Sequence, residues 1–112
     1  MTFFSVADAL KRAKAVGTVG KPVVLADFAD NPGGGGYGDT TGLLRGMIEA
    51  GLENAAMAAF YDPEVAAACH KAGLGGTVTM KLGGKVDARF GAPIDVTGTV
   101  THLSDGQMVI EG

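Results

Sequence analysis

A glycine-rich stretch between Asp30 and Thr41 is the part of this sequence whose residue types could do chemistry. It reads Asp-Asn-Pro-Gly-Gly-Gly-Gly-Tyr-Gly-Asp-Thr-Thr. Four consecutive glycines leave backbone N–H groups uncovered and let a ligand or another chain approach closely. Hydroxyls and N–H groups before a helix favour an anionic or carbonyl oxygen. The candidate substrate-binding residues are therefore Asp30, Asn31, Gly33, Gly34, Gly35, Asp39, Thr40 and Thr41.

Two nucleotide-binding patterns match this stretch only in their glycine spacing. Gly33, Gly35 and Gly38 fit the dinucleotide fingerprint, and Gly33 with Gly38 also has the P-loop spacing. Asp39 stands where a P-loop needs lysine, and its carboxylate would repel phosphates. The dinucleotide pattern expects an acid about 20 residues further on. Asp62 follows Gly33 by 29 residues and is explained as a helix N-cap, so both nucleotide interpretations are disfavoured.

The remaining reactive side chains do not form a recognisable catalytic group. Cys69 and His70 are adjacent, so on a helix they point about 100° apart and make a poor nucleophile–base pair. We interpret Cys69 as a core residue, and we place His70 and His102 at the surface. The sequence has no His-Glu-x-x-His motif, so no metal ligand is assigned and the catalytic residues stay unknown.

Several charged residues around the glycine stretch have structural interpretations. Asp39 could cap the following helix instead of binding a ligand. Asp27 is expected to brace the glycine stretch by accepting its N–H groups. The basic residues near Gly83 and Gly84 are expected to form a solvated loop, although they could meet an acidic substrate or another domain; they are Lys81, Lys85 and Arg89.

The elements that position the glycine stretch follow from hydrophobic periodicity. Apolar residues at helical spacing predict helices, and the apolar run Val23 to Ala26 predicts a strand that is covered on both faces. The expected helices are 5–16, 41–50 and 62–72, and the expected strands are 22–29, 55–61, 76–82, 93–103 and 107–110. Gly42 and Gly46 suggest that the second helix packs closely on the sheet. The predicted fold is α/β, a small three-layer-like sheet with helices, extended by antiparallel C-terminal strands.

Composition limits the classes of function. The 112 residues suit one domain, residues 1–112, and 46% of them are hydrophobic. A net charge of −3 without a basic stripe argues against nucleic acid, and no apolar run is long enough to span a membrane. With one cysteine and no signal peptide, we expect a cytoplasmic protein.

One family combines these features. The run from Pro22 to Gly35, followed by Gly-Asp-Thr-Thr at 38–41, resembles the C-terminal domain of the MlrC (microcystinase C) family. Asp-Pro-Glu at 62–64, Leu-Gly-Gly-Lys at 82–85 and Gly-Ala-Pro-Ile-Asp-Val at 91–96 also fit. The resemblance extends from about residue 5 to the end of the chain. Tyr37 departs from it, because a smaller residue is expected there.

The resemblance implies a zinc-dependent peptidase or amide hydrolase in which the glycine stretch forms part of the substrate cleft. It implies that zinc belongs to the parent protein and is held by an N-terminal metal-binding domain that this chain lacks, so this chain itself needs no cofactor. The expected partners are that missing domain and a peptide or other small-molecule substrate, and a homo-oligomer is compatible with the sequence. The alternative is a non-catalytic module that binds an anion, a metabolite or a partner protein.

Overall fold

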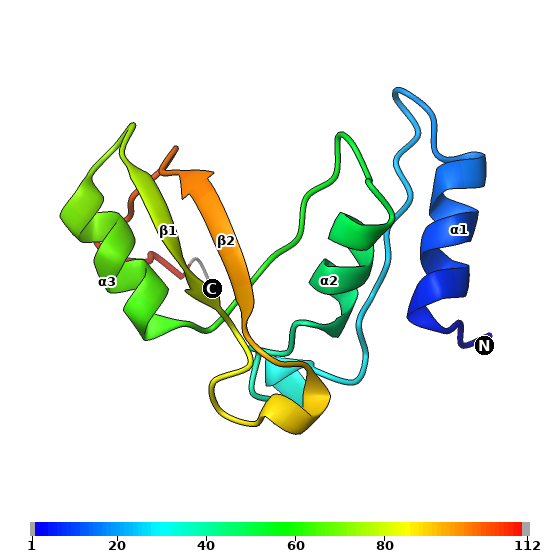
Figure 1. Ribbon diagram of the computed structural model, residues 1–112, viewed down its shortest axis with the longest axis horizontal. Helices are drawn as coiled ribbons and strands as arrows, with labels where there is room; N and C mark the ends of the chain where they lie inside the picture. Colours follow the sequence, from blue (N-terminus) through cyan, green and yellow to red (C-terminus); the bar gives the residue numbers. More distant parts are fainter. Residues whose placement is uncertain (1, 111–112) are drawn as a thin grey trace.

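The computed structural model describes residues 2–110 and shows a mixed α/β domain, as the sequence predicts (Figure 1). Its helices are α1 (Val6–Val16), α2 (Gly42–Glu49) and α3 (Pro63–Ala72), and its strands are β1 (Thr77–Leu82) and β2 (Ile94–Thr99). Two short 3-10 helices, η1 (Pro32–Gly34) and η2 (Ala88–Phe90), lie in the connecting loops.

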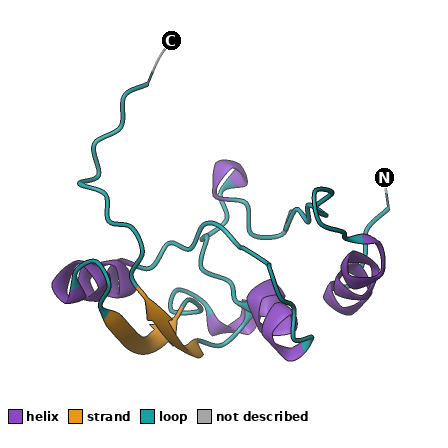
Figure 2. Ribbon diagram, turned by 90° about the horizontal axis from the view of Figure 1, so that it is seen from above, coloured by secondary structure: helices purple, strands orange, loops and turns teal. Residues whose placement is uncertain are grey.

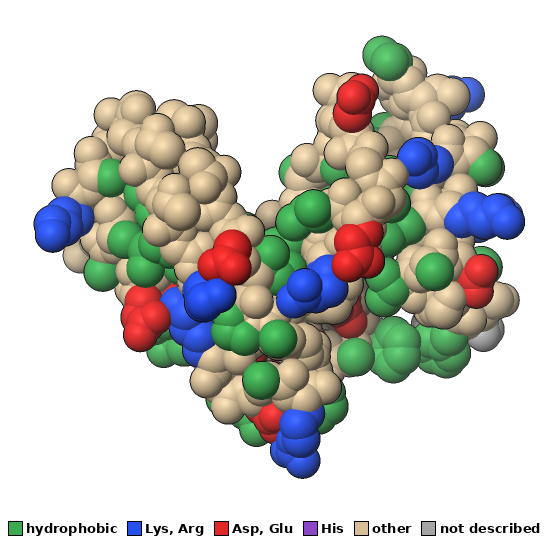
Figure 3. Space-filling view, viewed as in Figure 1, with side chains coloured by type: hydrophobic (Ala, Val, Ile, Leu, Met, Phe, Trp, Pro, Cys, Tyr) green, Lys and Arg blue, Asp and Glu red, His purple; other side chains and the backbone are tan. Residues whose placement is uncertain are grey.

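The elements form two lobes that meet at one end. Helices α1 and α2 pack together in one lobe, and α3 packs on the β1–β2 hairpin in the other, with η1 and η2 at the junction (Figures 1 and 2). The space-filling view shows a deep notch between the lobes (Figure 3). The radius of gyration is 15.3 Å, compared with about 13 Å for a compact chain of this length. The domain is therefore more open than a typical globular domain.

Local signals explain the helix boundaries. Ser5 caps α1 by accepting a hydrogen bond from the Asp8 N–H. Asp62 caps α3 by accepting from the Val65 N–H, with Pro63 at the first helical position. Helix α2 begins after Thr41, whose side chain makes no capping hydrogen bond. The interpretation of Asp39 as the cap of α2 is therefore wrong.

The β1–β2 hairpin is antiparallel and pairs Thr77 with Thr99 at one end and Leu82 with Ile94 at the other. The strands predicted at 76–82 and 93–103 are thus confirmed, the second ending earlier than expected. On the exposed face, the Thr79 and Thr97 hydroxyls are hydrogen-bonded at 2.9 Å. Such cross-strand pairs stabilise a hairpin that has no further strand beside it within residues 2–110.

Three predicted strands do not form. Residues 22–29, 55–61 and 107–110 have no strand partner among residues 2–110, and the described sheet has two strands only. The strand predictions for these three segments are therefore wrong, while the mixed α/β class holds. The physical reason is that a strand needs a neighbour to satisfy its backbone groups, and the described chain supplies none. The Val24 side chain, expected to be covered, is 87% exposed.

The buried core of the described residues is small and partly polar. Its hydrophobic members are Leu10, Ile94 and Val100. Three polar residues are equally buried, namely Asp39, Thr41 and Asp62. Buried polar groups need hydrogen-bond partners, and the partners of these three define the junction between the lobes. Within residues 2–110, no helix combines the length and the apolar character that crossing a membrane requires.

Helix α2 packs through Gly46 on α1, not on a sheet as its sequence suggested. A Cβ atom at Gly46 would lie 2.7 Å from Val6 Cγ1 and 2.9 Å from Leu10 Cδ1. At Gly42 it would meet nothing closer than the Phe90 carbonyl oxygen at 4.0 Å. The two glycines of one helix thus differ in the space around them.

We predict that Gly46→Val lowers the free energy of unfolding by about 1–3 kcal/mol, because it overpacks the α1–α2 contact. Gly42→Ala is the control, expected to change stability by no more than about 1 kcal/mol. Urea unfolding followed by circular dichroism measures both. Equal stability of Gly46→Val and the wild-type chain would show that this contact is not close-packed in solution.

Candidate functional site

The glycine loop, defined here as residues 30–41, is a tight turn closed by its own backbone. The Asn31 side chain accepts from the Gly33 N–H at 3.0 Å, which caps η1. The Asn31 carbonyl then accepts from the Gly34 and Gly36 N–H groups, both at 2.9 Å. A Cβ at Gly36 would lie 2.9 Å from the Asp30 carbonyl carbon and the Asn31 nitrogen. Glycine is therefore required at position 36 by the closeness of the backbone.

Asp30 braces this loop across its base. One of its carboxylate oxygens accepts from the Gly38 N–H at 2.8 Å, and the other accepts from the Thr40 N–H at 2.9 Å. Burial alone would raise the pKa of Asp30, but the hydrogen bonds from Thr40 and Gly38 outweigh it and lower the pKa. Asp27, which was expected to be the brace, accepts only from the nearby Ala29 N–H.

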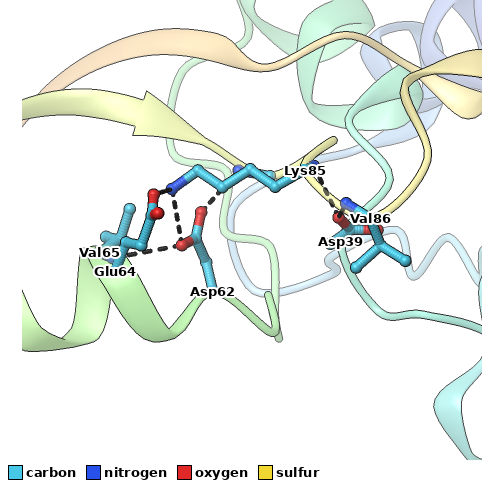
Figure 4. Close-up of polar contacts among 7 residues, drawn as sticks. Asp39, Asp62, Glu64, Val65, Lys85 and Val86 are labelled. Atoms are coloured by element: carbon cyan, nitrogen blue, oxygen red, sulfur yellow. Dashed lines mark hydrogen bonds and ion pairs between the residues drawn. The ribbon is translucent and has the colours of Figure 1, made fainter.

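Asp39 faces away from the loop and fixes the turn after β1. Its side chain is 1% exposed, and one oxygen accepts from the Lys85 and Val86 N–H groups, both at 2.8 Å (Figure 4). The Asp39 carbonyl accepts from the Gly84 N–H. The other carboxylate oxygen is buried without a partner among the described residues.

Thr41 is fully buried and joins the loop to the start of β2. Its hydroxyl donates to the Ala92 carbonyl at 2.7 Å, and the Arg45 guanidinium donates to the same oxygen at 3.0 Å. Gly91 lies against Thr41 so closely that a Cβ there would be 2.5 Å from the hydroxyl oxygen. The Thr41 hydroxyl therefore stabilises the contact between the loop and the start of β2.

Asp62 organises the other side of the junction. Beyond capping α3, it accepts from the Gly83 N–H at 2.9 Å and forms an ion pair with Lys85 at 2.8 Å (Figure 4). Lys85 also reaches Glu64. Burial raises the pKa of Asp62, but the hydrogen bonds from Lys85, Gly83 and Val65 outweigh it and lower the pKa. The hydrogen bonds that Lys85 donates to Asp62 and Glu64 raise the pKa of Lys85.

The expected solvated loop is confirmed for two of the basic residues near Gly83 and Gly84, because the side chains of Lys81 and Arg89 are 63% and 82% exposed, whereas that of Lys85 is 27% exposed. Lys85 belongs to the Asp62 network, Lys81 pairs with Asp95, and Arg89 pairs with Asp87. The sequence identified Asp62 as a cap but missed its bond to Lys85. The available signal was the unused lone pairs of the cap carboxylate: Lys85 shares Oδ1 with the capping Val65 N–H, and Gly83 takes Oδ2.

A cavity of about 300 Å³ lies beside the glycine loop. Its lining includes Asp30, Gly35, Gly36, Tyr37 and Thr40 from the loop and Phe90 from η2. Of the candidate residues, Asp30, Gly35 and Thr40 line this cavity, whereas Asn31, Gly33, Gly34, Asp39 and Thr41 do not. That all eight bind substrate stays a prediction. No motif or pattern in the sequence had indicated that Phe90 lines a cavity.

The charge of this cavity is negative. Asp27 and Asp30 are its charged lining residues, and no lysine or arginine lines it. The Thr40 N–H, which the sequence offered to a ligand oxygen, is taken by Asp30. The cavity therefore suits a neutral or a positively charged group better than an anion.

The described residues do not fit a zinc ion. Within residues 2–110, no group of three or more histidine, cysteine, aspartate or glutamate side chains is placed to hold a metal. Asp62 and Glu64, which lie within reach of the same cation, are both paired with Lys85. A zinc-dependent reaction would need ligands from outside these residues.

Fold and site together define a small mixed α/β domain built around a glycine loop that carboxylates hold in place. The family model for the MlrC C-terminus matches residues 25–112, and this chain belongs to that family. Microcystinase C from Sphingomonas sp. is 39% identical to it over 84 residues. Those residues make up 75% of this chain but 17% of that relative, so the chain spans a small part of the relative's length. The family resemblance found in the sequence is confirmed.

We predict that Asp39→Ala destabilises the domain by about 2–4 kcal/mol, because it leaves the Lys85 and Val86 N–H groups without their acceptor. Asp39→Asn keeps one acceptor oxygen and should cost less. Asp105→Ala, in an exposed turn, is the control for loss of a carboxylate. Urea midpoints provide the measurement, and an Asp39→Ala chain as stable as Asp105→Ala would contradict this role.

Stability should also fall in acid. An unfolded aspartate has a pKa of about 3.9, and the folded pKa values of Asp30 and Asp62 lie lower. Their contributions are therefore complete above the unfolded value and disappear as pH falls through the folded values. We expect unfolding free energy to drop below about pH 4, with a shallower drop in Asp30→Asn than in Asp105→Asn. Identical slopes in the two variants would exclude Asp30 as a contributor.

Proposed function

We propose that this chain is the C-terminal domain of an MlrC-type zinc-dependent peptidase or amide hydrolase, whose glycine loop forms one wall of the substrate cleft. The observation that carries the proposal is the cavity of about 300 Å³ bordered by the loop. Family membership supports it, since a curated relative is named Microcystinase C. The whole protein would act in the cytoplasm, as the sequence suggests.

The loop contributes a rigid wall. Asp30 ties the Gly38 and Thr40 N–H groups together, so the loop is ordered before any ligand arrives. Preorganisation of this kind lowers the cost of binding. Tyr37 and Phe90 present aromatic surface to the cavity, which suits apolar side chains of a peptide. This chain would therefore bind and orient the substrate.

Zinc would be held by an N-terminal metal-binding domain, as the family resemblance implies, and within residues 2–110 no group of donors is placed to hold it. When bound there, zinc would polarise the amide carbonyl and activate water. The residues of this chain act beside that chemistry. Asp30 keeps the loop in shape, and Asp39 keeps the loop attached to the β1–β2 hairpin.

The second candidate is a non-catalytic module for a small ligand or a partner protein. The same cavity favours it, because the cavity is present in a chain whose described residues hold no metal site. The two lining carboxylates make a neutral or cationic metabolite a better ligand than an anion.

We predict that the isolated 112-residue chain hydrolyses no peptide amide, even with added zinc. The assay uses fluorogenic peptide amides with zinc chloride, followed by a chelator. Chelator-sensitive turnover by the chain alone would overturn the division of labour between this domain and a metal-binding domain. A hybrid of microcystinase C, with this chain in place of its matching region, should in contrast be active.

In that hybrid, Tyr37→Ala should raise KM about tenfold through lost aromatic contact, while Tyr61→Ala is the matched control. Tyr61 is an exposed tyrosine that does not line the cavity. An unchanged KM would exclude the loop from the cleft. If the hybrid is inactive but metabolites raise the Tm of the isolated chain in a Tyr37-dependent way, the binding module is the better description.

A further inference from the structure

Two segments of this domain, residues 22–27 and 55–58, belong to no helix or strand and have no strand beside them among residues 2–110. Residues 22–27 and 55–58 make no backbone–backbone hydrogen bond with any described residue. From Val23 to Asp27 the side chains alternate, because Val23, Leu25 and Asp27 line one groove while Val24 does not line it and is 87% exposed. This period of two is the geometry of a β-strand.

The two segments face a common groove of about 1130 Å³, much larger than the cavity at the glycine loop. Residues 55–58 line it consecutively, so their backbone borders the groove directly. Leu10 of α1 and Leu43 and Met47 of α2 also line it. In Figure 1, α2 lies between the segments that precede and follow it. The groove is thus lined by the unpaired backbone of the two segments and by apolar side chains of α1 and α2.

The groove combines unpaired backbone with apolar side chains, which is unusual on the surface of a folded domain. Backbone N–H and C=O groups are nearly always paired once they are buried, so whatever covers this apolar face must also pair with the bordering backbone. The residues lining the groove are largely apolar, and its Lys14 already donates to the Ala50 carbonyl at 2.9 Å. The described chain buries three hydrophobic residues in its core while leaving valines and phenylalanines exposed. These features indicate that something apolar covers this face.

We propose that a single β-strand from the rest of an MlrC protein fills this groove and pairs with both segments. A strand offers donors and acceptors on both edges, which two unpaired walls require. A helix satisfies its backbone internally and would leave both walls unpaired. The matching region is 17% of Microcystinase C, so most of that relative's chain lies outside the domain and can supply the strand.

This inference rests on family membership and not on the proposed hydrolysis. It assigns the surface and the mode of contact, a completed sheet in which residues 22–27 and 55–58 flank an inserted strand. An inactive hybrid in which both segments are protected would therefore refute the proposed function and leave this inference standing.

Hydrogen–deuterium exchange tests the proposal in two proteins. In intact microcystinase C, the amides aligned with residues 55–58 should exchange at least tenfold more slowly than the 55–58 amides of the isolated 112-residue chain. Adding microcystinase C that lacks its matching region should slow exchange at 22–27 and 55–58 of the isolated chain. Fast exchange at 55–58 in the intact protein would overturn the proposal, even if the shortened protein fails to fold.

Proline variants test backbone pairing directly. Ala55→Pro and Ala56→Pro each remove one N–H, and neighbouring N–H groups point to opposite edges. At least one variant should bind the shortened microcystinase C about tenfold more weakly, the loss expected for a missing hydrogen bond. Val109→Pro, at an equally exposed valine outside the groove, is the control. Circular dichroism verifies that all variants fold.

Two outcomes would contradict the assigned occupant. If neither Ala55→Pro nor Ala56→Pro weakens binding more than Val109→Pro, the partner does not pair with this backbone. If the isolated chain forms a dimer by light scattering that Ala56→Pro disrupts, a second copy of this chain fills the groove instead.

Discussion

The arrangement of this domain depends on carboxylates that accept backbone N–H groups at the junction of its two lobes. Asp39 holds the Lys85 and Val86 N–H groups, and Asp62 holds the Gly83 N–H. Both acids therefore accept hydrogen bonds from the same short turn, residues 83–86, and lie on opposite sides of it (Figure 4). The turn cannot move without breaking several charge-assisted hydrogen bonds, which are stronger than neutral ones. The glycine loop, α3 and the hairpin are thereby fixed to one point.

The hydrogen bonds that Asp39 and Asp62 accept require glycine at two positions of the turn. Gly83 and Gly84 have φ of 63° and 60°, which side chains other than glycine rarely adopt. A Cβ at Gly83 would lie 2.5 Å from the Asp39 carbonyl oxygen. Burying carboxylates is costly unless they are paired, and here N–H dipoles do most of the pairing, with Lys85 as the single cation. The loop and its cavity therefore rest on backbone geometry more than on ion pairs.

The sequence predicted the elements that are stabilised by interactions between residues close together in the chain. Helices α1 and α3 carry their own caps, and β1 and β2 pair with each other, so the sequence identified all four. The role of Asp39 could not be predicted, because its partners lie 46 and 47 residues away. The same holds for Phe90, which reaches the cavity only through the fold. Asp30 was singled out as a candidate binding residue, but its role as a brace needed the positions of Gly38 and Thr40.

The failed strand predictions have a different physical origin. The apolar run at 23–26 is typical of a strand covered on both faces, and residues 22–27 are extended, yet unpaired. The sequence pattern reflects the surroundings in which a segment is buried, whereas pairing depends on which strands are present. Since the matching region is a small part of Microcystinase C, pattern and structure agree once a strand from elsewhere is added. The groove is lined by residues of α1, α2 and the segments around them, so such a strand would be added within the lobe that α1 and α2 form.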